Sequence, residues 1–230
     1  MKTLVLKLKG PLQSWGSSSR YRTRSTHTEP TKSGVLGLLA AAQGRARTDD
    51  IADLAKLEFG VRVDQPGTLE RDFQTAREEK AVNPRLSYRY FLADAVFIAA
   101  VSGEDSLIES LADAVKSPQF PLFLGRRSCP ANPDLFLGLR DGGIEEALRA
   151  EPWHASEWHR ASRADQVHLP LFRDAQAGED GDSLRDTPRS FSQENRSYHW
   201  RTVFEAAPVT LDNPQGKKNI DPFLETVRSL

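Results

Sequence analysis

The stretch that decides how the N-terminal half folds reads TEPTKSGVLGLLAAAQG, from Thr28 to Gly44. Polar residues come before an apolar run, which predicts a helix from about Lys32 to Gln43 with Thr31 or Ser33 as its N-cap. The free backbone N–H groups and the positive dipole end of such a helix, beside a lysine, suit a phosphate. The alternative interpretation is an ordinary capped core helix behind a solvated basic loop, and this stretch alone leaves both open.

Two glycines, Gly34 and Gly37, lie inside the predicted helix. A glycine in a helix interior costs about 1 kcal/mol relative to alanine, so we expect another backbone to approach the helix closely there. The stretch is not a nucleotide-binding P-loop, because the glycine-rich turn that must precede the Lys-Ser pair is missing.

The composition and charge of the chain point to one anion-binding surface. The 230 residues are 38% hydrophobic and 27% charged, which is typical of a globular protein with one large domain or two small ones. The net charge of −1 hides an uneven distribution, because residues 1–47 contain nine Lys or Arg and one acid, Glu29. A basic segment on a nearly neutral protein favours a nucleic acid as the partner.

Cysteine content and hydropathy indicate the compartment. The single cysteine, Cys129, excludes an intramolecular disulfide and a cysteine-based metal cluster. The sequence has no run of 18 apolar residues, and its start leads directly into a predicted strand rather than a signal peptide. We therefore expect a cytoplasmic protein with no membrane segment, no metal and no cofactor.

Residues 1–142 predict alternating strands and helices. Thr3–Lys9 alternates like a strand that is buried mainly on one face. Residues 67–87 carry mixed charge and predict a protruding hairpin or mobile loop, with a solvated helix over Glu70–Lys80 as the alternative. The other predicted elements are helices over Asp49–Leu57 and Ser106–Lys116 and strands over Glu58–Asp64, Tyr88–Val101 and Leu135–Leu139. This order predicts an α+β fold with a ferredoxin-like domain, whose helices pack on one face of a four-stranded sheet as in RNA-recognition modules.

Residues 143–230 predict a small, mostly β C-terminal region. We expect a helix over Ile144–Ala150, a mobile acidic loop at 176–186 and a last pair of strands within Arg189–Val209. His154, Glu157 and His159 suggest a metal site, but histidines five residues apart on a helix point about 140° from each other. We therefore interpret both histidines as surface residues beside a packing pair, Trp153 and Trp158.

Five ordered motifs carry a family resemblance. They are LKGPLQSWG at residues 8–16, PTKSGVLGLL at 30–39, YFLADAVF at 90–97, LGRRSCP at 124–130 and TPRSF at 187–191. With these motifs the chain resembles the CasD family, the CRISPR-associated subunit of the type I-E Cascade complex. The resemblance covers nearly the whole chain and implies a ferredoxin-like N-terminal domain with a protruding thumb at 67–87.

The resemblance also implies a role and partners. Proteins of this family hold the repeat-derived 5′ handle of the CRISPR RNA (crRNA) at one end of Cascade. They lie beside the CasC backbone subunits and the large subunit CasA, and they meet target DNA indirectly through the complex. The implied thumb reaches over the neighbouring backbone subunit, and its basic residues in this chain are Arg71, Arg77, Lys80 and Arg85.

The candidate RNA ligands combine cations for phosphates with rings on which splayed bases stack. Trp15 is explained equally well as a core anchor, and Tyr90 is explained better as one. The candidate RNA-binding residues are Trp15, Arg20, Tyr21, Arg22, Arg24, His27, Lys32, Ser33, Gly34, Tyr88, Arg126 and Arg127.

Catalysis is the alternative to binding. Metal-independent RNA cleavage needs a base, an acid and a cation, and His27, Tyr21 and Lys32 lie close together in the sequence. Relatives in another CRISPR subtype process precursor RNA with a tyrosine, a lysine and a histidine. The resemblance to type I-E systems instead implies a dedicated companion endonuclease, which leaves this subunit non-catalytic.

Overall fold

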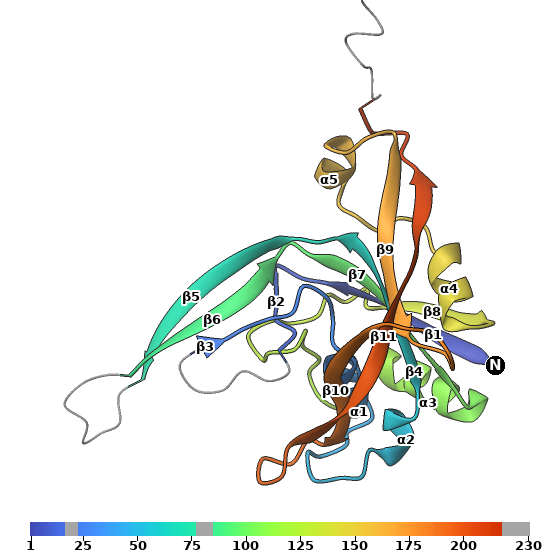
Figure 1. The fold of residues 1–230 in the computed structure, drawn as a ribbon. Coiled ribbons are helices and arrows are strands. Elements are labelled where there is room, and N and C mark those ends of the chain that lie inside the picture. Colours follow the sequence, from blue (N-terminus) through green and yellow to red (C-terminus); the bar gives the residue numbers. More distant parts are fainter. Residues whose placement is uncertain (17–22, 77–84, 218–230) are drawn as a thin grey trace, which may run out of the picture.

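The computed structural model describes residues 1–16, 23–76 and 85–217, which form a mixed α/β fold in which strands predominate. A seven-stranded sheet runs through the molecule in the order β10-β11-β9-β4-β7-β1-β8 (Figure 1). Its strands are β1 (Lys2–Lys9), β4 (Glu58–Gln65), β7 (Val96–Gly103), β8 (Phe136–Asp141), β9 (Gln166–Asp174), β10 (Asp182–Ser190) and β11 (Ser197–Asp212). Within the described residues, we find no helix with the length and apolar character that crossing a membrane requires.

β1 lies inside the sheet and is buried on both faces. Leu4, Leu6 and Leu8 face the core beneath the helices α1 (Lys32–Ala42) and α3 (Asp105–Lys116), whereas Val5 belongs to a second core on the other face. Successive strand residues point to opposite faces, and here helix α4 (Ile144–Ala150) covers the second one. Burial of β1 is therefore not confined to the face of Leu4, Leu6 and Leu8, because Thr3 and Val5 on the other face are buried as well. The two helices of the predicted ferredoxin-like domain, α1 and α3, do lie on one face, whereas α4 of the C-terminal region covers the other.

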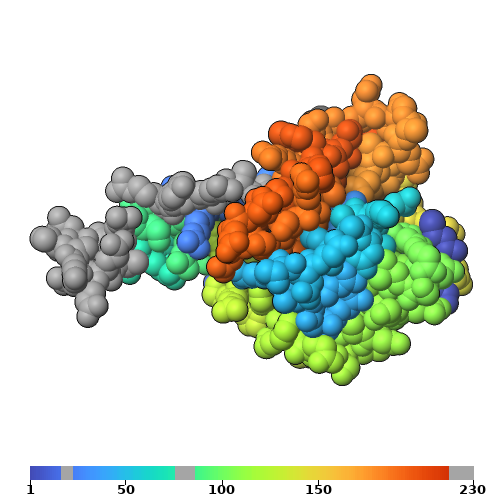
Figure 2. All heavy atoms as spheres, turned by 90° about the horizontal axis from the view of Figure 1, so that it is seen from below, coloured from blue at the N-terminus to red at the C-terminus, as the bar shows by residue number. Residues whose placement is uncertain are grey.

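The predicted central helix is present as α1 (Lys32–Ala42). Thr31 is its N-cap, and the Thr31 Oγ1 accepts the backbone N–H of Gly34 at 3.3 Å. The side chains of Val35, Leu36 and Leu39 are fully buried. The other helices are α2 (Ala52–Ala55), α3 (Asp105–Lys116) and α5 (Glu157–Ala161). Figure 2 shows α1 and α2, in blue to cyan, packed against the orange and red C-terminal strands.

A second, smaller sheet projects from the first (Figure 1). Its central strand β6 (Arg85–Ala93) pairs antiparallel with β5 (Thr68–Ala76) and β2 (Leu12–Gln13), and parallel with β3 (Thr23–Arg24). The predicted hairpin is thus present, and the alternative helix is wrong for the part of it that the structure describes. Both long strands contain β-branched or aromatic residues, which favour extended structure: Thr68, Phe73 and Thr75 on β5, and Tyr88, Tyr90 and Phe91 on β6.

The predicted strand over Tyr88–Val101 is two strands, β6 and β7. Between them the chain turns at Asp94, whose φ of 56° lies in the left-handed region that aspartate tolerates better than most residues. The Asp94 backbone N–H donates to the Pro11 carbonyl at 3.1 Å. The turn transfers the chain from the small sheet to the large one.

The C-terminal strands extend the large sheet. β9 pairs with β4 through Gly60–Arg62, so the predicted boundary after residue 142 does not separate two sheets. The acidic segment 176–186 is not one loop, because Asp182–Asp186 belong to β10. The last two strands are present as β10 and β11, and β10 begins seven residues before the predicted Arg189.

Candidate nucleic-acid interface

The N-terminus of α1 already holds an anion that the protein supplies. The Asp186 carboxylate, which is fully buried, accepts the backbone N–H of Lys32 at 2.7 Å. The Lys32 ammonium in turn lies 2.8 Å from an oxygen of Asp174. A phosphate at this helix N-terminus would have to compete with Asp186 for the Lys32 N–H and with Asp174 for the Lys32 ammonium, and Ser33 is buried, so the anion site predicted at Lys32 and Ser33 stays a prediction that this packing disfavours.

Arg201 completes this acid–base network. Its guanidinium contacts Asp186 at 2.6 Å and Asp174 at 2.8 Å and lies over the Phe59 ring. Burial lowers the pKa of Arg201, but the hydrogen bonds and charges of the two carboxylates outweigh it and raise that pKa overall. The network joins α1 to β9, β10 and β11, so its cations stabilise the fold.

The glycines of α1 make room for large side chains of the protein itself. A Cβ on Gly34 would lie 2.8 Å from the Trp15 ring, and one on Gly37 would lie 3.4 Å from the Phe191 ring. Trp15 is 1% exposed, and its Nε1 donates to the Gln13 Oε1 at 3.1 Å. Close approach to the helix is thus present, but side chains rather than another backbone make it. Trp15 packs in the core against Gly34, which favours its interpretation as a core anchor, and RNA contact by either residue stays a prediction.

Three arginines lie close together at the small sheet, two on its strands and one on a neighbouring turn. We call Arg24, Arg89 and Arg126 the arginine cluster. Arg24 and Arg89 are partners in the β3–β6 pairing. Arg126 comes from a tight turn at Gly125, and its Nη2 donates to the Arg24 carbonyl at 2.9 Å. Its guanidinium lies over the Phe91 ring, 4.8 Å from the ring centre. Three segments distant in the sequence thus bring three guanidinium groups together.

The arginine cluster is short of acceptors. Arg126 Nη1 and Arg89 Nε are buried without a hydrogen-bond partner, and none of the three arginines is in an ion pair with a carboxylate of the described chain. Asp72 is opposite Arg89 in the β5–β6 ladder, but no ion pair joins them. Burial, with the charges of Arg89 and Arg24, lowers the pKa of Arg126. A buried N–H without an acceptor is costly, so this surface suits an incoming anion.

Two tyrosines, Tyr88 and Tyr90, adjoin Arg89 on β6 and lie on the opposite face of the strand, because successive strand residues point to opposite faces. Tyr88 is half-buried, pairs with Thr23 in the sheet, and has the Arg71 guanidinium 5.5 Å from its ring centre. Tyr90 is also half-buried, and Arg127 is exposed. The candidates Arg20, Tyr21, Arg22, Arg77 and Lys80 lie outside the described residues, and Arg85 begins β6. Sequence reasoning missed Arg89, although its place between two tyrosines was a usable signal.

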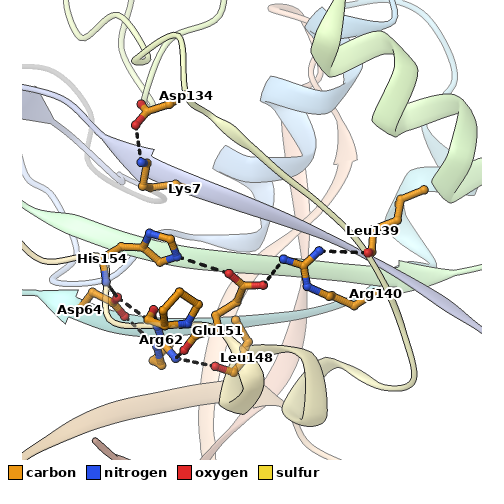
Figure 3. A network of polar contacts seen from close by, with 10 residues as sticks. Lys7, Arg62, Asp64, Asp134, Leu139, Arg140, Leu148, Glu151 and His154 are labelled. Carbon is orange, nitrogen blue, oxygen red and sulfur yellow. Dashed lines mark hydrogen bonds and ion pairs between the residues drawn. The ribbon is translucent and has the colours of Figure 1, made fainter. Parts of the chain in front are cut away.

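The histidines of the catalytic and metal hypotheses have other surroundings. The His27 backbone N–H donates to the Trp15 carbonyl at 2.9 Å. His154 points toward Glu151, which also pairs with Arg140, as Figure 3 shows. Among the described residues, no group of three or more His, Cys, Asp or Glu side chains could hold a metal ion.

His159 is buried rather than on the surface, which corrects its sequence interpretation. Its ring lies edge-on to Trp153 and Trp158, with centroids 6.1 and 5.5 Å away. Burial, with the charge of Arg163, lowers the pKa of His159, so the neutral imidazole is favoured. His159 is therefore a buried residue that packs edge-on against both tryptophan rings.

Comparison with known proteins gives consistent matches. The model of a family described as CRISPR-associated protein (Cas_Cas5) matches residues 3–204. CRISPR system Cascade subunit CasD of Escherichia coli (strain K12) is 38% identical over 157 residues, which are 59% of this chain and 70% of the relative. A solved structure described as "Crystal structure of Cas protein" has a TM-score of 0.71 and 39% identity, covering 94% of this chain and 98% of that one. A chain of "CRISPR RNA-guided surveillance complex" has a TM-score of 0.77 and 30% identity, covering 99% and 98%.

Proposed function

The chain belongs to the Cas5 family of CRISPR-associated proteins, and from this premise we propose that it is a non-catalytic RNA-binding subunit of a type I-E Cascade complex. In this role it holds the 5′ handle of the crRNA and contacts the CasC backbone subunits and CasA. It meets target DNA only through the complex and works in the cytoplasm. The order β1-α1-β4-β7-α3-β8 supports a ferredoxin-like central unit for this subunit.

The arginine cluster is the observation that carries the proposal. Its guanidinium groups have N–H donors that lack acceptors in the folded chain, at Arg89 and Arg126. Phosphate oxygens are the acceptors that a planar guanidinium fits best. The half-buried ring of Tyr88 lies on the opposite face of β6, beside the Arg71 guanidinium, and offers a separate stacking surface for a splayed base. Guanidinium groups that no internal carboxylate neutralises suit the phosphates of a single-stranded RNA segment.

Removal of the three charges tests the proposed site. We expect Arg24→Gln, Arg89→Gln and Arg126→Gln together to weaken binding of handle RNA and to make its salt dependence shallower. Each phosphate contact on a single strand contributes about 0.7 to the slope of log K against log salt, so the slope should fall by about 2. The measurement is fluorescence anisotropy with labelled handle RNA, together with recovery of crRNA in the assembled complex.

A matched control removes three exposed cations elsewhere, in Arg47→Gln, Lys56→Gln and Lys217→Gln. This control keeps the change in net charge the same, so general electrostatic attraction falls equally in both variants. Equal loss of affinity in the two triple variants would show that the arginine cluster is not the handle site.

The non-catalytic part of the proposal has its own support and test. Lys32, the cation of the catalytic alternative, is 6% exposed and is paired with Asp174. A lysine held in this way is not free to stabilise a phosphorane. Incubation of the full chain with labelled repeat RNA in EDTA should give no product. Specific cleavage that His27→Ala abolishes would establish the endoribonuclease instead.

A further inference from the structure

The outward face of the β10–β11 hairpin carries an aromatic and basic surface that the proposed handle site does not use. Trp200 on β11 is 66% exposed, and Arg185 is its direct partner across the ladder on β10. Tyr198 lies two residues before Trp200 and therefore on the same face of the strand. Arg196 has its guanidinium 5.5 Å from the centre of the Tyr198 ring and donates to the tyrosine hydroxyl.

The two faces of this hairpin have opposite roles. Arg201, next to Trp200, points inward and is neutralised by Asp186 and Asp174. From Arg185 to Trp200 the exposed charged side chains are three arginines, Arg185, Arg189 and Arg196, and one acid, Glu194. The inward face is thus structural, whereas the outward face has an excess of positive charge around an exposed tryptophan.

We propose that the outward face of the β10–β11 hairpin binds a single-stranded nucleic acid, with a base stacked on Trp200 and phosphates held by Arg185 and Arg196. A large exposed ring beside unneutralised guanidinium groups is what a flexible single strand requires, because every base has a face that stacks. The Arg185 side chain is held in place by its Nε, which donates to the Tyr198 carbonyl at 3.2 Å. The charge excess favours a polyanion over a neutral protein surface.

This surface is separate from the arginine cluster, so its test uses the full chain in which that cluster is already disabled. In the background of Arg24→Gln, Arg89→Gln and Arg126→Gln, we expect residual binding of a labelled U12 or dT12 strand at low salt. Adding Trp200→Ala should weaken that binding about fivefold or more, since stacking on one ring contributes at least that much. Adding Arg185→Gln and Arg196→Gln should lower the salt slope by about 1.4.

Trp158→Ala is the matched control, because Trp158 is 61% exposed and lies on α5, away from this hairpin. Equal effects of the two tryptophan variants, or no effect of Trp200→Ala, would overturn the proposal. So would a Trp200→Ala variant that binds both strands normally but fails to assemble with the other subunits, since the surface is then a protein interface.

Two labelled strands identify the source of the ligand. Photocrosslinking with 4-thiouridine RNA and with 4-thiothymidine DNA should label the peptide that contains Tyr198 and Trp200. Preferential labelling by RNA assigns the surface to the guide, and preferential labelling by DNA assigns it to a DNA strand. Labelling confined to other peptides would overturn the proposal, and it would do so whether or not the arginine cluster binds the handle.

Discussion

Basic side chains lie close together both at the N-terminus of α1 and in the arginine cluster. The two regions differ in whether the protein itself supplies the counterion. At α1, Lys32 and Arg201 face the carboxylates of Asp174 and Asp186 at 2.6–2.8 Å. In the arginine cluster no carboxylate of the described chain takes part, and two buried N–H groups have no acceptor. Basic residues thus indicate a binding site only where internal acids leave them unneutralised.

The comparison predicts that the α1 network is essential for stability and irrelevant to RNA. Asp186→Asn would leave Arg201 and the Lys32 N–H without their buried anion, and removal of one partner of a buried ion pair costs about 3–5 kcal/mol. Urea denaturation should show this loss in the free energy of unfolding. Asp182→Asn, an exposed change on the same strand, should alter stability by less than about 0.5 kcal/mol. An Asp186→Asn variant as stable as the unchanged protein would show that the α1 network does not stabilise the fold, and the contrast with the arginine cluster would then be lost.

The reverse pattern is expected for Arg126→Gln. Loss of charged hydrogen bonds to a phosphate should weaken handle binding by about 1.5–3 kcal/mol, or roughly 10- to 150-fold. Stability should be unchanged or increased, because burial and the charges of Arg89 and Arg24 already disfavour the cation in the free protein. Anisotropy and urea denaturation on the same samples measure both quantities.

Lys32→Gln is the counterpart of Arg126→Gln. It should lower stability while leaving the RNA affinity of the folded protein within about twofold, because its ammonium already binds Asp174. Loss of affinity without loss of stability in Lys32→Gln would instead restore the predicted phosphate site at α1.

The elements that sequence periodicity predicted well are those with local causes. α1 begins after its Thr31 cap, and α4 has the predicted bounds Ile144–Ala150. The errors involve partners distant in the chain. Asp186 lies 154 residues from the Lys32 N–H that it caps, and no local pattern shows that pairing. Similarly, burial of both faces of β1 depends on α4, which follows more than 130 residues later.

The candidate site divides in the same way. Arg24 and Arg126 were predicted from basic motifs, and the structure brings them into direct contact beside Arg89, which was missed. The sequence left two roles for Trp15, base stacking and core packing, because an isolated aromatic residue has no periodic signal. Its environment depends on Gly34, which lies on a helix later in the chain. Cations are visible in a sequence, but their neutralisation is a tertiary property.

Gly34→Ala tests whether the glycines of α1 serve packing. The added methyl carbon would lie 2.8 Å from the Trp15 ring, which is closer than carbon atoms pack. We expect a loss of about 1–3 kcal/mol in the free energy of unfolding, because overpacking outweighs the gain in helix propensity. Gly37→Ala is the control, since its methyl would make an ordinary contact with Phe191 at 3.4 Å. Equal stabilities of the two variants would show that the Trp15 side chain can move away from the added methyl group at no cost in stability.

The smallest effect concerns Glu179, which belongs to the acidic segment predicted to be mobile and solvated. Its carboxylate contacts Arg173 at 2.7 Å, and this hydrogen bond, with that of the Gln176 N–H, lowers the pKa of Glu179 to about 2. A carboxyl whose pKa is lower in the folded state stabilises the fold above the ordinary glutamate value of about 4.3. That contribution is lost as the pH falls from there toward 2, so Glu179→Gln should flatten the acid limb of stability against pH. A carboxyl resonance of Glu179 that titrates in NMR near 4.3 would instead place this acid in solvent and leave Glu145 as the carboxylate that neutralises Arg173.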